Sequence, residues 1–146
     1  MIVQEVQQVI PRPTAEVYDF VVTHYVENHP RWDASCIRTQ LDGGAELSIG
    51  ATGEEVRKQM GRETTYKFRV TELTGDHVTF EATGGGTSFG ATWSVVALDE
   101  ASSRLTISYR LGMGGVMRLF EPIMRGGVRK QMTQAAQRIN ALVGPS

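Results

Sequence analysis

The sequence predicts an α+β protein in which a curved antiparallel sheet of about seven strands wraps around one long C-terminal helix. Between residues 35 and 111, apolar and polar side chains alternate, which is typical of strands with one buried face. After Gly115 the apolar residues instead recur with the 3.6-residue period of an amphipathic helix. A strand and two short helices precede these regions, so the expected order is strand, two helices, six strands and the long helix.

The first 30 residues predict a strand followed by two short helices. Residues 2–10 alternate like a strand that ends at Pro11, and Pro13 suits the first turn of a helix. Val17, Phe20 and Val21 then form one apolar helical stripe. A second brief turn of helix follows within residues 23–30, and Pro30 is expected to stop it because proline disfavours helix at the residue before it.

Six strands follow, separated by glycine-rich and polar turns. Residues 36–41 and 53–59 are the less regular strands, whereas the later four alternate clearly. The alternation points five aromatic side chains toward the buried face of the sheet, namely Tyr66, Phe68, Phe80, Trp93 and Tyr109.

The final helix presents one apolar stripe that suits the open face of the sheet. Pro122 and the pair Gly126 and Gly127 are expected to kink or interrupt this helix. Because one helix cannot fill all the space over a strongly curved sheet, we expect an internal cavity or cleft between them. The stripe contains Val116, Leu119, Phe120, Ile123, Met124, Val128, Met132, Ala135, Ala136, Ile139, Leu142 and Val143.

Composition narrows the class of protein. A chain of 146 residues suits one domain spanning 1–146, and its 15 basic and 16 acidic residues give no general attraction to nucleic acid. The one cysteine, Cys36, excludes a disulfide within the chain. The N-terminus lacks signal-peptide features and the longest uncharged stretch, residues 82–98, alternates like a strand. The expectation is a soluble cytoplasmic protein without membrane insertion.

The ordered segments resemble the START-like, or Bet v 1-like, superfamily (the SRPBCC group), and within it the bacterial polyketide cyclase/dehydrase-type proteins. The matching pieces are PRPTAEVYDFV, NHPRWD, YKFRVTEL with VTFEAT, ATWSVVAL, RLTISYRL and GMGGVMRLFEP. The resemblance covers nearly the whole chain and implies a helix-grip fold with a cavity between the sheet and the C-terminal helix. Members of the superfamily bind lipids, sterols, plant metabolites or polyketides, and some are enzymes, so the fold does not fix the function.

The expected cavity has an aromatic and methionine-rich lining. Buried Tyr and Trp side chains either hydrogen-bond within a packed core or present polar groups to a ligand, and the sequence leaves both interpretations open. The residues expected to line the cavity are Trp32, Tyr66, Phe68, Phe80, Trp93, Tyr109, Phe120, Met124 and Met132.

Candidates for acid–base chemistry are Asp19, His24, His29, Tyr66 and Tyr109, of which His24, Tyr66 and Tyr109 are preferred. Glu63 and Arg110 point outward by the same alternation, and no Ser/His/Asp set is present. His24 and His29 are five residues apart and Cys36 is the only thiol, so the sequence lacks zinc-ligand spacing. We therefore expect neither a metal nor a cofactor.

Three hypotheses for function follow. The first is binding of a small, largely hydrophobic ligand such as a lipid, a polyketide or an aromatic metabolite. The alternative is a polyketide cyclase or dehydratase that uses Tyr and His groups in the same cavity. The third is contact with a protein partner through the basic face of the last helix, which includes Arg125 and Arg129. The sequence leaves monomer and homodimer open.

Overall fold

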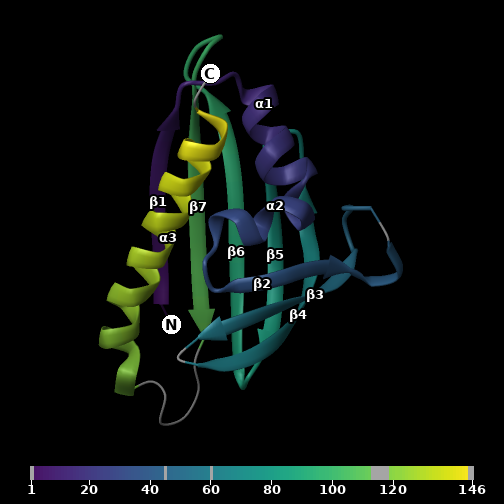
Figure 1. Ribbon diagram of the computed structural model, residues 1–146, viewed down its shortest axis with the longest axis vertical. Helices are drawn as coiled ribbons and strands as arrows, with labels where there is room; N and C mark the ends of the chain where they lie inside the picture. The colour runs from purple at the N-terminus through teal and green to yellow at the C-terminus, as the bar shows by residue number, and fades with distance from the viewer. Residues whose placement is uncertain (1, 45, 60, 113–118, 145–146) are drawn as a thin grey trace.

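Seven antiparallel strands form one sheet in the order β1-β7-β6-β5-β4-β3-β2, and a long helix runs lengthwise beside β1 and β7 (Figure 1). The computed structural model describes residues 2–44, 46–59, 61–112 and 119–144. The strands are β1 (Ile2–Ile10), β2 (Cys36–Leu41), β3 (Thr52–Gln59), β4 (Arg62–Leu73), β5 (His77–Gly84), β6 (Thr87–Ala97) and β7 (Ser103–Gly112). The helical segments are α1 (Thr14–Tyr18), η1 (Asp19–Thr23), α2 (Tyr25–Trp32), η2 (Asp42–Gly44) and α3 (Glu121–Val143).

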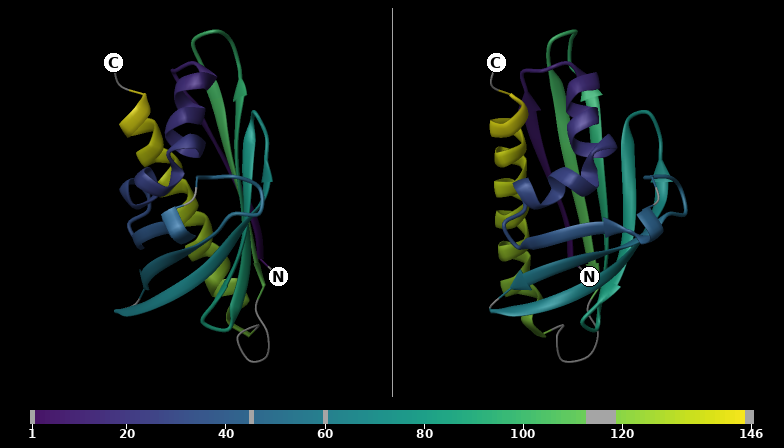
Figure 2. Two further views of the ribbon diagram at one scale, coloured as in Figure 1. Left: turned by 90° about the vertical axis from the view of Figure 1, so that its right-hand side faces the viewer. Right: turned by 45° about the vertical axis from the view of Figure 1, so that its right-hand side comes forward.

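The sheet is strongly curved, which opens space between it and α3. Figure 2 shows β2 and β3 sweeping across the direction of β1, β6 and β7. The pairing register shifts between Cys36 and Arg38 and again between Val70 and Glu72. Such irregularities bend a strand and increase its twist. The predicted α+β helix-grip arrangement is confirmed.

The helix α3 runs unbroken from Glu121 to Val143 and packs against β1 and β7. The expected interruption is therefore wrong. Pro122 lies in the first turn, where its missing N–H costs nothing, and the two glycines cost helix stability without ending it. The predicted helix start at residue 116 lies outside the described residues.

The first described residues of the predicted apolar stripe are more exposed than expected. Leu119, Phe120 and Ile123 are 76%, 52% and 77% exposed. Leu119 and Phe120 precede the described helix, so they do not share its buried face. The fully buried part of the stripe begins at Met132 and includes Ile139.

The helix α2 continues past Pro30 to Trp32, which corrects the expected stop. Proline removes only one hydrogen bond, and the N–H of Asp33 still donates to the carbonyl of His29 at 3.1 Å. Trp32 is 1% exposed and packs on Trp93, with ring centroids 5.5 Å apart. Burial of this large side chain stabilises the last turn of α2.

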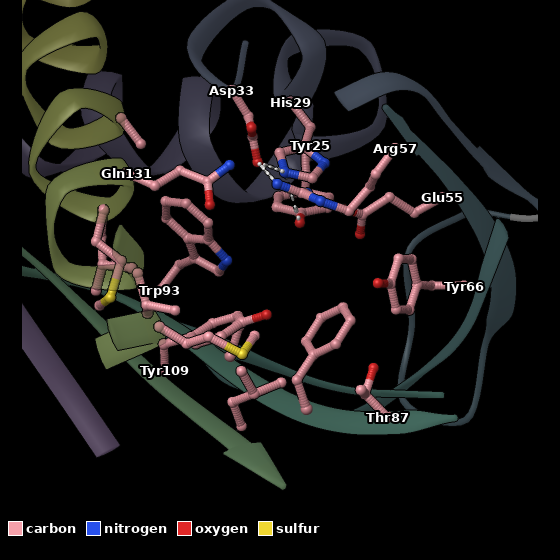
Figure 3. Close-up of a pocket in the computed structure, with 18 residues that line it drawn as sticks. Tyr25, His29, Asp33, Glu55, Arg57, Tyr66, Thr87, Trp93, Tyr109 and Gln131 are labelled. Carbon is pink, nitrogen blue, oxygen red and sulfur yellow. Dashed lines mark hydrogen bonds and ion pairs between the residues drawn. The ribbon is translucent and has the colours of Figure 1, made fainter. Parts of the chain in front are cut away.

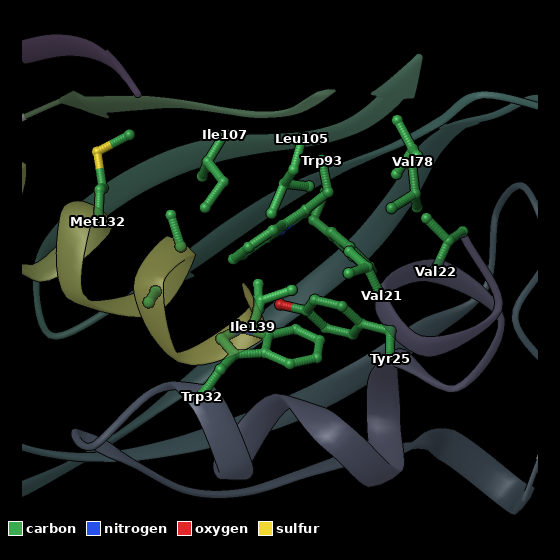
Figure 4. Close-up of a cluster of buried hydrophobic side chains, with 14 of the residues drawn as sticks. Val21, Val22, Tyr25, Trp32, Val78, Trp93, Leu105, Ile107, Met132 and Ile139 are labelled. Atoms are coloured by element: carbon green, nitrogen blue, oxygen red, sulfur yellow. The ribbon is translucent and has the colours of Figure 1, made fainter. Parts of the chain in front are cut away.

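The hydrophobic core joins α1, α2, α3 and the inner face of the sheet (Figure 4). Tyr25 of α2 stacks on Phe80 of β5 at 4.4 Å between ring centroids. Val21 of η1 and Ile139 of α3 are fully buried in the same cluster. The short helices therefore close one end of the space under α3.

Two of the basic residues of α3 make contacts within the protein. Arg125 pairs with Glu121 at 3.1 Å, and Arg129 donates to Oε1 of Gln4 at 3.1 Å and to the carbonyl of Glu5 at 3.3 Å. Arg129 thus ties α3 to the edge strand β1.

In the described part of the chain, no helix combines the length and the apolar composition needed to cross a bilayer.

Substituting Gly127 with alanine is expected to stabilise the protein by about 0.5–1 kcal/mol, because glycine in a helix interior loses more backbone entropy on folding. A Cβ added there meets no atom within 4 Å. At Gly53 the added Cβ would clash with the carbonyl oxygen of Gln40, so Gly53→Ala should destabilise. Urea unfolding of both variants checks this, and a loss of stability in Gly127→Ala would contradict it.

Candidate ligand-binding site

A pocket of about 160 Å³ lies between α3, α2 and the inner face of the sheet (Figure 3). It forms where the sheet curves away from α3, so its walls come from elements that are distant in the sequence. The lining residues are Tyr25, His29, Asp33, Glu55, Arg57, Tyr66, Thr87, Phe89, Ala91, Trp93, Ile107, Tyr109, Leu111, Met124, Val128, Gln131, Met132 and Ala135.

One wall of the pocket is aromatic and apolar. Phe89 of β6 stacks on Tyr109 of β7 at 5.3 Å, and Tyr66 of β4 meets the edge of Phe89 at 5.2 Å. Met124 and Met132 face this wall from α3. The stacked rings offer a flat apolar surface, and the flexible thioether side chains opposite can adapt to the shape of a molecule placed against it.

The indole N–H of Trp93 is a hydrogen-bond donor inside the pocket. Trp93 is only 6% exposed, and its Nε1 has no hydrogen-bond partner among the described residues. Figure 3 shows this edge of the ring facing the cavity. The Nε1 of Trp32 also lacks a partner in the described part of the chain, but Trp32 does not line the pocket. A buried donor without a partner costs free energy that an acceptor on a ligand would recover.

The opposite wall is ionic. Arg57 of β3 donates from Nη2 to Oδ2 of Asp33 at 2.8 Å and pairs through Nη1 with Oε1 of Glu55. His29 Nε2 lies 3.4 Å from Oδ2 of Asp33 and 3.4 Å from the hydroxyl of Tyr25. These side chains are mostly buried, so each charge depends on its partner.

Asp33 and His29 in this wall are both charged at neutral pH. Burial acts to raise the pKa of Asp33, but its hydrogen bond with His29 and the charge of Arg57 hold it well below its usual range. Burial acts to lower the pKa of His29, but hydrogen bonds to Asp33 and Cys36 raise it to about 9. Burial raises the pKa of Tyr109 above its usual range, so its phenol is a donor rather than a base.

The structure separates the sequence-predicted cavity residues into two groups. Tyr66, Trp93, Tyr109, Met124 and Met132 line the pocket together. The others lie elsewhere: Trp32, Phe68 and Phe80 are in the hydrophobic core, and Phe120 is exposed.

His24 does not reach the pocket. Its side chain is 52% exposed and lies near Asp19 and Glu27, at 3.5 Å and 3.3 Å. His29, one turn later on α2, is 2% exposed and lines the pocket instead.

Sequence reasoning missed most of the ionic wall. Glu55 and Arg57 lie within the charged segment TGEEVRKQ, whose charges suggest an exposed strand. The available signal is their spacing, because residues two apart on a strand share one face. Asp33 and Gln131 carry no such signal, since their position depends on how α2 and α3 pack against the sheet.

Comparison with known proteins places this sequence in a family. Residues 1–144 match the family model described as polyketide cyclase / dehydrase and lipid transport. No curated protein matches the chain. A START superfamily protein from Mycobacterium smegmatis shares the fold with a TM-score of 0.76 at 11% identity, over 97% of this chain and 96% of that one.

Two further solved structures share the fold. Ara h 8.0201 matches with a TM-score of 0.74 at 16% identity, over 97% of this chain and 96% of that one. The Zhui aromatase/cyclase from a Streptomyces species matches with a TM-score of 0.72 at 12% identity, over 97% of this chain and 92% of that one.

Proposed function

The chain belongs to the polyketide cyclase / dehydrase and lipid transport family, and we propose that it binds a small ring compound bearing a carbonyl or similar oxygen acceptor. The observation that carries this proposal is that Nε1 of Trp93 has no hydrogen-bond partner among the described residues and lies in a pocket with one aromatic wall. Small-molecule sites commonly combine apolar walls with a few convergent polar groups.

The pocket volume sets the size of the ligand. An engineered protein cavity of about 150 Å³ takes up benzene. The pocket here, at about 160 Å³, suits one ring with a short substituent and not a whole long-chain lipid. Acetophenone, one ring with a ketone, is therefore a suitable probe, and α-methylstyrene is its matched control because a methylene replaces the carbonyl oxygen.

Trp93→Phe is expected to weaken acetophenone binding about fivefold relative to its effect on α-methylstyrene, because one hydrogen bond contributes about 1 kcal/mol. Calorimetric titration of both compounds into both proteins measures this difference. The comparison cancels the loss of packing, since that loss affects both compounds. Equal changes for the two compounds would show that the indole N–H is not the recognition group.

A second candidate function is proton transfer next to a carbonyl, as a cyclase or dehydratase requires. It is favoured by Tyr66 and Tyr109 lining the same pocket as the carboxylates of Asp33 and Glu55. A proton acceptor and a donor for the resulting enolate are the groups such chemistry needs.

Deuterium exchange separates the two candidate functions. Proton abstraction would exchange the methyl hydrogens of bound acetophenone in D₂O faster than buffer does, and Tyr109→Phe would slow that exchange. Exchange at the buffer rate with saturated protein leaves ligand binding as the function.

A further inference from the structure

Three buried side chains of different chemistry converge beside the ionic wall. His29 of α2, Cys36 at the start of β2 and Glu55 of β3 each offer a ligand atom, and these atoms lie within 4.8 Å of one another. The three residues are 2%, 6% and 4% exposed. An imidazole, a thiol and a carboxylate are the donor types that zinc accepts in proteins.

The spacing of two donor atoms fits a zinc ion. Sγ of Cys36 lies 3.6 Å from Nδ1 of His29. Zinc–sulfur and zinc–nitrogen bonds of about 2.3 Å and 2.0–2.1 Å at a tetrahedral angle place the two ligand atoms about 3.6 Å apart. Cys36 and His29 would thus need little movement to hold the ion.

Asp33 orients the histidine in a way typical of metal sites. Its Oδ2 faces Nε2 of His29 at 3.4 Å, which leaves Nδ1 directed toward Cys36 and toward Oγ1 of Thr39, at 2.8 Å. Histidine ligands commonly donate their second ring N–H to a carboxylate in this manner.

The charges around the cluster also suit a divalent cation. Binding of the ion would release the proton of the Cys36 thiol and the extra proton of His29 to solvent, because metal ligands bind in their deprotonated forms. The carboxylates of Asp33 and Glu55 and the Cys36 thiolate would then carry three negative charges, and Arg57 one positive charge. The two remaining negative charges equal the charge of one zinc ion. Arg57 occupies one oxygen of Glu55, and a carboxylate has a second oxygen for an ion.

We propose that His29, Cys36 and Glu55 bind one zinc ion at the edge of the ligand pocket. Because His29 and Glu55 also line the pocket, an ion can enter through it, and a remaining coordination position is open to a bound molecule. This site is contrary to the expectation from sequence spacing, since the fold rather than a local motif brings the three ligands together. It goes beyond the proposed ligand-binding function and does not depend on it.

Titration of the metal-free 146-residue chain with Co²⁺ tests the proposal. We expect one equivalent to bind with a thiolate-to-cobalt charge-transfer band, which Zn²⁺ then abolishes by displacement. Cys36 is the only cysteine in the sequence, so such a band identifies its ligand even in the wild-type protein. Absence of the band in folded protein would overturn the proposal.

Two variants test the ligands, and a third is the control. Cys36→Ser should lose the band, and Glu55→Gln should weaken Co²⁺ binding by at least about tenfold. The matched control is His77→Gln, because half-buried His77 lies 2.8 Å from exposed Asp76 and 2.9 Å from exposed Glu72 and could hold an ion adventitiously. A normal near-ultraviolet circular dichroism spectrum confirms that each variant is folded.

The outcomes of the Co²⁺ titration are distinct from those of the acetophenone titration. Binding that is unchanged in Cys36→Ser and Glu55→Gln but lost in His77→Gln would overturn the proposal in favour of the surface cluster. Acetophenone titration in the presence of a chelator measures the organic ligand alone, so a failure of either proposal leaves the other standing.

Discussion

Arg57→Met is expected to destabilise the protein by about 3–5 kcal/mol, because removing one member of a buried ion network leaves the remaining charges uncompensated. Arg57 is the cation that contacts both Asp33 and Glu55, and these carboxylate side chains are only 12% and 6% exposed. Methionine retains most of the length of the side chain, so the loss is electrostatic rather than steric. Urea unfolding at pH 7 measures the change.

The control for this prediction is Arg110→Met. Arg110 pairs with Glu81 at 2.9 Å, which is close to the 2.8 Å between Arg57 and Asp33, but both partners are about half exposed. An exposed ion pair contributes about 0–1 kcal/mol. If Arg57→Met costs no more than Arg110→Met, the ionic wall is hydrated and does not form the buried network described above.

Ala135→Phe is expected to abolish acetophenone binding, because its ring would occupy the pocket from the α3 side. Ala135 is 7% exposed and lines the pocket, whose volume of about 160 Å³ leaves no room for both a phenyl side chain and a ligand. Overpacking is expected to lower the free energy of unfolding by about 1–3 kcal/mol. Calorimetric titration measures the loss of binding.

The same substitution at Ala141 is the control. Ala141 lies on α3 but is exposed, so Ala141→Phe should bind acetophenone as the wild type does. Retention of wild-type affinity in Ala135→Phe would place the ligand outside this pocket.

The sheet and its inner face could be predicted from sequence because alternation fixes which side of a strand each residue faces. Tyr66, Trp93 and Tyr109 point inward for this reason, and the structure places all of them at the pocket. Alternation does not separate pocket from core. Phe80 also faces inward, but Tyr25 of α2 stacks on it and excludes it from the lining.

The ionic wall depends on contacts between distant segments. Asp33 and Arg57 are 24 residues apart, and their ion pair forms only once α2 packs against β2, which pairs with β3. Period-based arguments assign charged residues to the solvent face, and a buried network violates that assumption. The placement of Phe120 in the cavity lining differs from its exposed position for a local reason, because the described helix begins after it.

A crystal structure of the protein with acetophenone tests the central claim most directly. We predict electron density for the ring between α3 and the face formed by β6 and β7, with the carbonyl oxygen within hydrogen-bond distance of Nε1 of Trp93. Density for acetophenone only outside this pocket, with the cavity filled by rearranged side chains, would contradict the account.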